Sequence, residues 1–200
     1  MTTTIIISLA VIGLIIFWAI GIYNYLIRLR NQVQNSWSQI SVQLQRRYDL
    51  IPNLVETVKG YMGYEKGTLE AVIQARSAAL SAKERIDKSG GPTGSGSIKD
   101  LLTAESSLKS ALGNFFALAE NYPQLKASEP MIRLQEELSS TENKISFSRQ
   151  AYNDQVMNYN IAQQTFPSNL FASILGFHPA ELFDVEDPQA RKAVKVSFDN

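Results

Sequence analysis

The sequence of 200 residues contains no cysteine and a single histidine, His178. The absence of cysteine excludes disulfides, thiol nucleophiles, iron–sulfur clusters and cysteine-type zinc sites, and one histidine leaves little for a histidine-rich metal site. Basic and acidic residues balance at 19 each, so the chain lacks the cationic excess that normally neutralises nucleic-acid phosphates. We therefore expect no nucleic-acid partner, no metal and no cofactor.

Charge is also missing from the first 27 residues, and every charged side chain lies from Arg28 onward. Residues 5–27 form a mostly apolar run of ~23 residues, which as a helix rises ~35 Å and exceeds the ~30 Å hydrocarbon core of a bilayer. A cleaved signal peptide is the alternative reading. However, no basic residue precedes the run, the run is too long, and no small-x-small cleavage site precedes Arg28. The sequence predicts one transmembrane helix within residues 1–27.

Aromatic and basic residues gather at the C-terminal end of this run. Trp18, Tyr23 and Tyr25 are suited to the headgroup level of a membrane, and Arg28 and Arg30 follow at once. Because positive residues favour the cytoplasmic side, we expect the short N-terminus outside and the domain that begins at Arg28 in the cytoplasm.

Beyond the run, apolar residues recur at helical spacing. The first such helix continues to about Lys59, and its apolar seam keeps its register through Pro52, which favours one kinked helix over a break near Asp49. Three further helices are predicted over residues 64–88, 98–121 and 129–165. Two long helices and a shorter hairpin predict an all-α fold, an up-down four-helix bundle with long, coiled-coil-like antiparallel helices.

The predicted bundle covers residues 28–166 and contains an uncharged linker at 89–97, and a tail follows over 167–200. Since the first helix leaves the membrane, the fourth should return towards it with the apolar start of the tail. This apolar segment, which either contacts the membrane interface or caps the base of the bundle, includes Leu170, Phe171, Ile174 and Phe177. A later alternating stretch with Val194, Val196 and Phe198 predicts one strand, which stays extended on the surface or pairs with another chain.

Charged and polar residues cluster on the two long helices. They are Arg46, Arg47, Asp49 and Glu56 on the first, and Glu137, Glu142, Asn143 and Arg149 on the fourth. Paired carboxylates suggest a di-iron site, but such a bundle needs Glu-x-x-His on two helices, and the sequence has no histidine to serve. We interpret the set as an inter-helix or inter-subunit polar network that fixes the register. The asparagines of the fourth helix, among them Asn153, Asn158 and Asn160, likewise suggest polar pairing between helices.

Two blocks of the sequence resemble the LemA family. The first block runs from Tyr25 to Tyr61 and ends in DLIPNLVETVKGY. The second block runs from Tyr122 to Phe177 and includes Thr141-Glu142-Asn143, Arg149-Gln150, Tyr152-Asn153 and Phe166-Pro167. Both blocks occur in order and together cover most of the chain.

The resemblance implies a bacterial inner-membrane protein with one N-terminal span and a cytosolic helical domain, and it brings no enzymatic activity. One hypothesis is a non-enzymatic scaffold, a homo-oligomer that self-assembles through its helical bundle and organises the lipid bilayer. The alternative is an adaptor or regulator of a membrane-bound protease or quality-control complex, because the family is often found with membrane metallopeptidases and TPM-domain proteins. A branch of the family is linked to magnetosome membranes.

Overall fold

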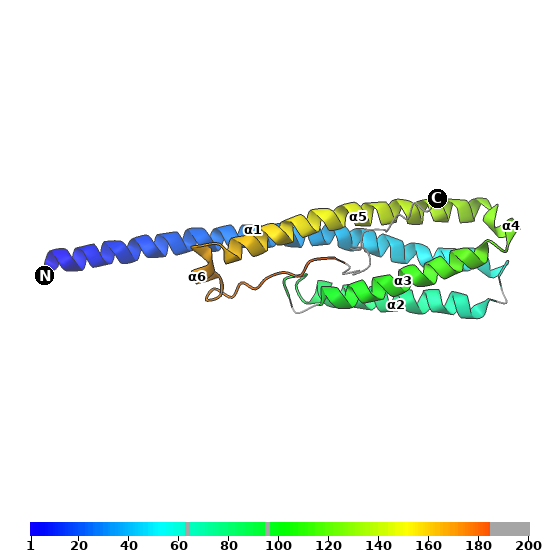
Figure 1. The fold of residues 1–200 in the computed structure, drawn as a ribbon, viewed down its shortest axis with the longest axis horizontal. Coiled ribbons are helices and arrows are strands. Elements are labelled where there is room, and N and C mark those ends of the chain that lie inside the picture. Colours follow the sequence, from blue (N-terminus) through cyan, green and yellow to red (C-terminus); the bar gives the residue numbers. More distant parts are fainter. Residues whose placement is uncertain (63–64, 95–96, 185–200) are drawn as a thin grey trace, which may run out of the picture.

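The computed structural model describes residues 1–62, 65–94 and 97–184, and these residues contain helices and no β-strand. In chain order the helices are α1 (Thr2–Lys59), α2 (Lys66–Lys88), α3 (Ile98–Ala119), α4 (Pro123–Lys126), α5 (Glu129–Gln164) and α6 (Ser168–Ala172). The molecule is elongated, with the other helices gathered along the C-terminal part of α1 (Figure 1). The predicted strand with Val194, Val196 and Phe198 lies outside the described residues.

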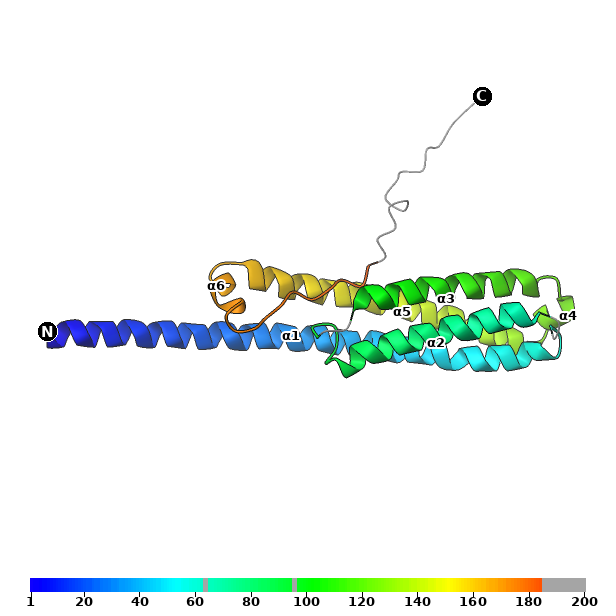
Figure 2. The ribbon, with the colours of Figure 1, turned by 90° about the horizontal axis from the view of Figure 1, so that it is seen from below.

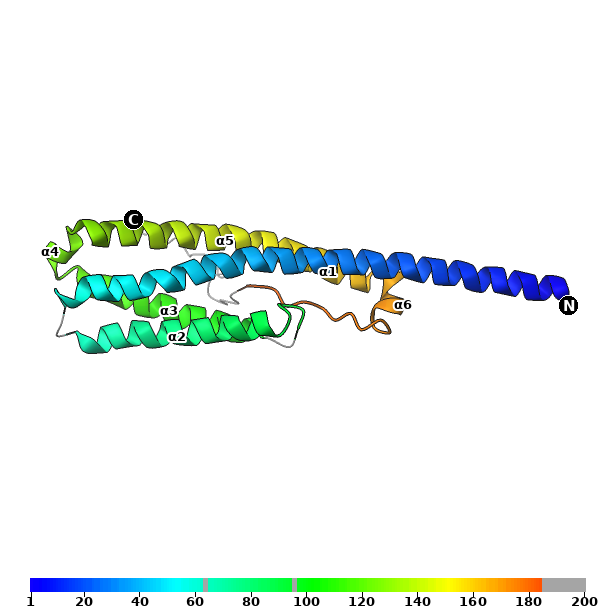
Figure 3. The same cartoon turned by 180° about the vertical axis from the view of Figure 1, so that it is seen from behind.

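Helix α1 is a single helix of 58 residues that continues through Pro52. The prediction of one helix rather than a break is therefore confirmed. The large apolar side chains from Ile5 to Phe17 are exposed, and no other described helix lies beside the N-terminal end of α1 (Figure 3). Among the described helices, α1 is the one that is long and apolar enough to cross a membrane.

The C-terminal part of α1 packs along α5, which runs in the opposite direction, and α2 and α3 form a hairpin beside them (Figures 1 and 2). The predicted seam of α1 is buried at Val33, Trp37, Ile40, Leu44, Tyr48, Ile51, Val55 and Val58. Because these residues recur every three or four positions, they lie on one helical face and pack against the matching face of α5. At the middle of this pair the rings of Trp37 and Tyr152 meet edge to face, with centroids 6.1 Å apart.

The hairpin differs in detail from its prediction. Helix α2 begins at Lys66 rather than residue 64, α3 ends at Ala119 rather than residue 121, and the one-turn helix α4 was not predicted. Ser128 is the N-cap of α5, and its hydroxyl donates to the carbonyl of Leu125 instead of accepting from the helix.

After α6 the chain reverses and runs back in extended form beside α5 (Figure 2). The reversal uses Gly176, whose φ of 75° lies in the left-handed region that favours glycine. We call residues 177–184 the strap. Phe177, Ala180 and Phe183 of the strap are buried, so this segment is part of the folded core.

Candidate functional site

A buried arginine joins three helices. Arg47 of α1 is 6% exposed, and its guanidinium pairs with Glu105 of α3 and with Glu142 of α5. The hydroxyl of Tyr48, the next residue of α1, donates to the other carboxylate oxygen of Glu105. An arginine fork that holds two carboxylates fixes both the rotation and the register of the helices that carry them.

The surroundings of this cluster keep Tyr48 neutral. Burial raises the pKa of the Tyr48 phenol well above its usual value of about 10, the charge of Arg47 opposes this shift, and Asp87 adds to it. A neutral phenol can donate to a carboxylate, which the ionised form cannot do. The cluster of Arg47, Tyr48, Glu105 and Glu142 therefore combines ion pairs with a phenol hydrogen bond across α1, α3 and α5.

A second arginine compensates for the proline inside α1. Pro52 has no N–H, so the carbonyl of Tyr48, four residues earlier, lacks its helical partner. The guanidinium of Arg76 in α2 donates to this carbonyl, with 2.6 Å between Arg76 Nε and Tyr48 O. The proline thus creates an acceptor inside the helix, and the neighbouring helix satisfies it.

The structure brings together only Arg47 and Glu142 of the eight polar residues singled out on the two long helices. Arg46 is exposed, Asp49 accepts from Gln45 of its own helix, and Glu56 pairs with Lys59 of its own helix. On α5, Glu137 and Asn143 are exposed and Arg149 is half-buried. Among the residues that the structure describes, no hydrogen bond or ion pair joins these six residues to another helix.

Sequence analysis missed Glu105 and Arg76 as members of the polar clusters. A signal for Glu105 was present, because it follows Leu101 by four residues and precedes Leu108 by three, and both leucines are buried. An acidic residue at a seam position of a helix indicates a buried partner of opposite charge. Arg76 carries the same signal, because it follows Val72 by four residues and precedes Ala79 by three, and both of these residues are buried.

Two asparagines of α5 bind the strap through its backbone. Asn160 donates to the carbonyl of Ala180 and accepts from its N–H, each at 2.9 Å. Asn153 makes the same pair of bonds with Phe183, at 3.2 and 2.8 Å. Each amide side chain therefore reproduces the two hydrogen bonds of a β-bridge, and the interpretation of these two asparagines as partners between helices is corrected.

The strap also reaches the hairpin. The hydroxyl of Tyr152 donates to the carbonyl of Glu181, at 2.7 Å, and the Glu181 carboxylate accepts from the backbone N–H of Ile98, at 3.0 Å. Ile98 is the first residue of α3, where a carboxylate satisfies a free N–H and complements the helix dipole. Burial, and secondarily Glu181, raises the pKa of Tyr152 above its usual range.

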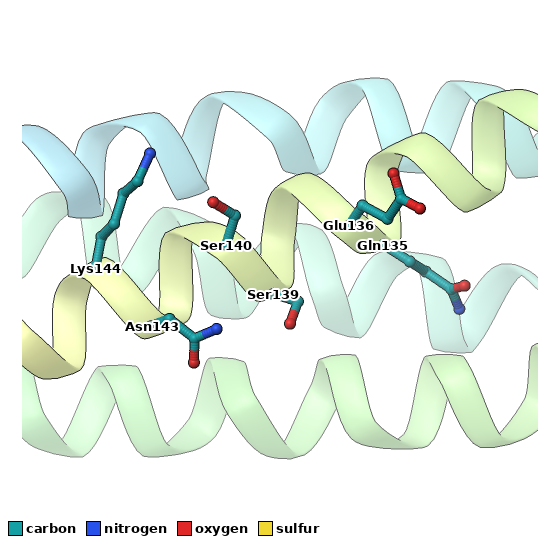
Figure 4. Close-up of a pocket in the computed structure, with 6 residues that line it drawn as sticks. All are labelled: Gln135, Glu136, Ser139, Ser140, Asn143 and Lys144. Atoms are coloured by element: carbon teal, nitrogen blue, oxygen red, sulfur yellow. The ribbon is translucent and has the colours of Figure 1, made fainter.

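An apolar groove lies between α3 and α5. It has a volume of about 430 Å³, and Leu112, Phe116 and Leu138 line it together with Arg47 and other polar residues. A second hollow is formed by α5 residues alone: Gln135, Ser139 and Asn143 point to its α3 side, and Glu136, Ser140 and Lys144 point to the other side (Figure 4). Because one helix supplies all six residues, this hollow is an open surface rather than an enclosed site.

Two of the predicted membrane-interface residues lie where α6 and the start of the strap meet α1. The ring of Trp18 contacts that of Phe171, with centroids 6.5 Å apart, and the ring of Tyr23 contacts that of Phe177, at 5.7 Å. Tyr25 and Arg28 are exposed, and exposed Arg30 is 3.4 Å from the hydroxyl of Thr93. Leu170 and Ile174 are exposed as well.

Among the described residues, no group of three or more histidine, aspartate or glutamate side chains is placed to hold a metal ion. The carboxylates of Glu105 and Glu142 are the nearest approach to such a group, and both are occupied by Arg47. What this cluster can do is hold helices together.

The chain matches the LemA family over residues 36–198. It is 29% identical over 176 residues to Magnetosome protein MamQ 2 of Paramagnetospirillum magneticum, with 80% of this chain and 64% of that protein covered. It is 26% identical over 179 residues to Magnetosome protein MamQ of Magnetospirillum gryphiswaldense, with the same shares covered. The chain thus spans less than two thirds of the length of these relatives.

A relative of more similar length is Protein LemA of Metamycoplasma hominis. The two are 28% identical over 176 residues, which cover 88% of this chain and 75% of that protein. The family match takes in the seam of α1 from Ser36, the hairpin, α5 and the strap. On this match, which covers well over half of the sequence, the chain belongs to the LemA family.

Proposed function

We propose that this protein is a non-enzymatic, single-pass scaffold of a bacterial inner membrane. The N-terminal part of α1 spans the bilayer, and α1, α2, α3 and α5 pack as a four-helix bundle on the cytoplasmic side. Copies of the chain associate through their bundles and thereby organise the membrane that anchors them.

The observation that carries this proposal is the continuity of α1. One helix contains both the exposed apolar segment and the buried seam of the folded domain. No flexible connection separates the two parts, so the rod projects from its membrane segment with a defined direction. A protein that organises a membrane needs such a rigid connection, whereas a tethered enzyme does not.

Exposed apolar surface on α5 supports association between copies. Phe147, at the middle of α5, is 77% exposed, and Ile132, near the start of α5, is 43% exposed. The apolar groove beside Leu112 and Phe116 offers further contact area. An exposed apolar surface rimmed by polar residues, as in this groove, is a feature of protein–protein contact sites. The relatives that are named for the magnetosome also favour a structural role.

The mass of the full-length protein in mild detergent tests self-assembly. We expect a homo-oligomer whose mass, measured by light scattering, falls when Phe147→Asp places a charge on the exposed face of α5. Ser107→Asp adds the same charge at an exposed position of α3 and should leave the mass unchanged. A monomer at all concentrations would overturn the scaffold, and a stoichiometric foreign protein in the purified complex would favour the adaptor hypothesis instead.

The topology has its own test, because the chain contains no cysteine. A single Ser139→Cys substitution places a thiol on the exposed surface of α5. We expect a membrane-impermeant maleimide to label it only after the inner membrane of spheroplasts is opened. Labelling of intact spheroplasts would place the domain outside the cytoplasm and contradict the proposal.

A further inference from the structure

A second stretch of the sequence is free of charge. Residues 155–180 contain no Asp, Glu, Lys or Arg. They comprise the end of α5, all of α6 and the beginning of the strap. Such a stretch is comparable with the uncharged residues 1–27, although it is far from them in the sequence.

The two uncharged stretches pack against each other. Phe171 contacts Trp18, Phe177 contacts Tyr23, and the adjoining α1 residues Ile22 and Leu26 are buried. In all three ribbon views α6 lies against the part of α1 that leads to the N-terminus (Figures 1, 2 and 3). The end of the soluble domain therefore reaches along the predicted membrane span itself.

The position of these contacts along α1 determines their depth. A hydrocarbon core of ~30 Å requires ~20 helical residues. Any such window within the apolar run of residues 5–27 includes Trp18 and Tyr23. The rings of Phe171 and Phe177, which touch these two residues, consequently lie at the level of the membrane.

The outer surface of this segment matches that environment. Its exposed apolar side chains are Phe166 (71% exposed), Leu170 (56%), Ile174 (83%) and Leu175 (40%). Its backbone is also largely satisfied locally, because the N–H groups of Asn169, Leu170, Leu175, Gly176 and Phe177 donate to carbonyls of residues 165–173. Local backbone pairing is what a non-aqueous environment requires of a short inserted segment.

We propose that residues 166–177 insert into the cytoplasmic leaflet of the bilayer and form a second membrane contact beside the span of α1. The inserted surface consists of apolar side chains that meet lipid acyl chains, while Arg28 and Arg30 follow at the headgroup level. The inference rests on the proposed membrane span. It adds that the domain contacts the bilayer at two points, and the second contact fixes the rotation of the domain about α1.

Fluorescence quenching by lipid measures this insertion directly in the full-length protein. Three variants each carry one cysteine with a bimane label, at the exposed positions Ser173, Ser8 or Ser139. Each variant is placed in nanodiscs of phosphatidylethanolamine and phosphatidylglycerol whose acyl chains are brominated. Ser8 lies in the proposed span and Ser139 lies far along α5. We expect strong quenching at positions 8 and 173 and none at position 139.

The three labels separate the possible failures. If position 8 is quenched and position 173 behaves like position 139, the span stands and the second contact is wrong. If position 8 is not quenched, the span fails and the inference fails with it.

A charge variant gives an independent readout. The double substitution Leu170→Asp and Ile174→Asp should abolish quenching at position 173 and shift its emission to that of a solvent-exposed label. Val42→Asp is the matched control, because it charges an exposed apolar residue of α1 without changing residues 166–177. Circular dichroism that matches the parent protein establishes that the variants are folded. Unchanged quenching in the double variant would overturn the proposal.

Discussion

The two ends of the α1–α5 pair are held together by different chemistry. Near α6 the contacts are made by aromatic rings, apolar side chains and the neutral amide of Asn160, within stretches that carry no charge. Farther along, the guanidinium of Arg47 joins α1 to Glu142 of α5 and also to Glu105 of α3. The change occurs within one pair of continuous helices.

The proposed membrane insertion accounts for this difference. Beside a bilayer an ionised side chain is costly, and at that end the neutral amide of Asn160 supplies hydrogen bonds to the strap. Away from the proposed insertion, an ion pair keeps one exposed partner, as with the half-exposed Glu142 side chain, and loses less hydration.

The largest expected effect is at the charged end. Arg47→Ala leaves the nearly buried carboxylate of Glu105 without its cation, so the free energy of unfolding should fall by about 3–5 kcal/mol. Urea titration of the full-length protein in detergent measures this change. Arg46→Ala removes an exposed neighbour and should cost less than about 0.5 kcal/mol. Equal losses of unfolding free energy in the two variants would mean that the burial of Arg47 does not determine how much it contributes to stability.

At the neutral end, the asparagine bonds should be the weak point. Asn160→Ala removes both hydrogen bonds to Ala180, and we expect a loss of about 1–3 kcal/mol together with faster amide hydrogen exchange of the strap. Exchange followed by mass spectrometry on peptides from residues 177–184 checks this. Asn158→Ala, at an exposed position of the same helix, is the control and should leave the exchange unchanged.

A smaller, coupled effect is expected at Pro52. Arg76→Ala should cost about 1–3 kcal/mol because it leaves the Tyr48 carbonyl without a partner. In a Pro52→Ala background the new N–H of residue 52 can bond to this carbonyl, so the same substitution should cost less. A double-mutant cycle of unfolding free energies measures the coupling. Additive effects would show that Arg76 does not compensate for the proline.

The smallest effect at neutral pH concerns Tyr152. Its pKa is raised by burial in the folded protein, so the unfolded chain, whose tyrosine pKa is about 10, releases the proton first. This contribution to stability is complete below about pH 10 and is lost as the pH rises through the folded pKa. Tyr152→Phe should therefore flatten the fall of the urea midpoint above pH 10. A parallel fall in both proteins would contradict the assignment.

Much of the helical framework could be predicted from spacing alone. The seam from Val33 to Val58 kept its three- and four-residue steps across Pro52, and a seam without a shift in register is compatible with one helix and not with a new one. The burial of Arg47 beside that seam was harder to foresee. The residue adjoins the apolar face, and the decisive partner, Glu105, lies on another helix.

The strap shows why the rest was not predictable. Asn153 and Asn160 bind backbone atoms, and backbone atoms leave no residue-specific signal in the sequence. The residues that they hold, Ala180 and Phe183, have no helical or strand period, so the sequence left open whether the tail caps the bundle or contacts the membrane. The packing of Phe183 near Trp37 adds to the asparagine bonds that hold the strap beside α5.

The uninterrupted α1 makes the molecule a lever. The 37 residues of α1 beyond Ile22 rise ~55 Å, so a change of ~10° in the tilt of the proposed membrane segment displaces the far end of the rod by ~10 Å. Tilt adjusts to the match between the apolar length and the bilayer thickness. On the proposed membrane placement, a change of a few ångströms in that thickness is converted into a larger movement at the end of the rod that carries α4 (Figure 1).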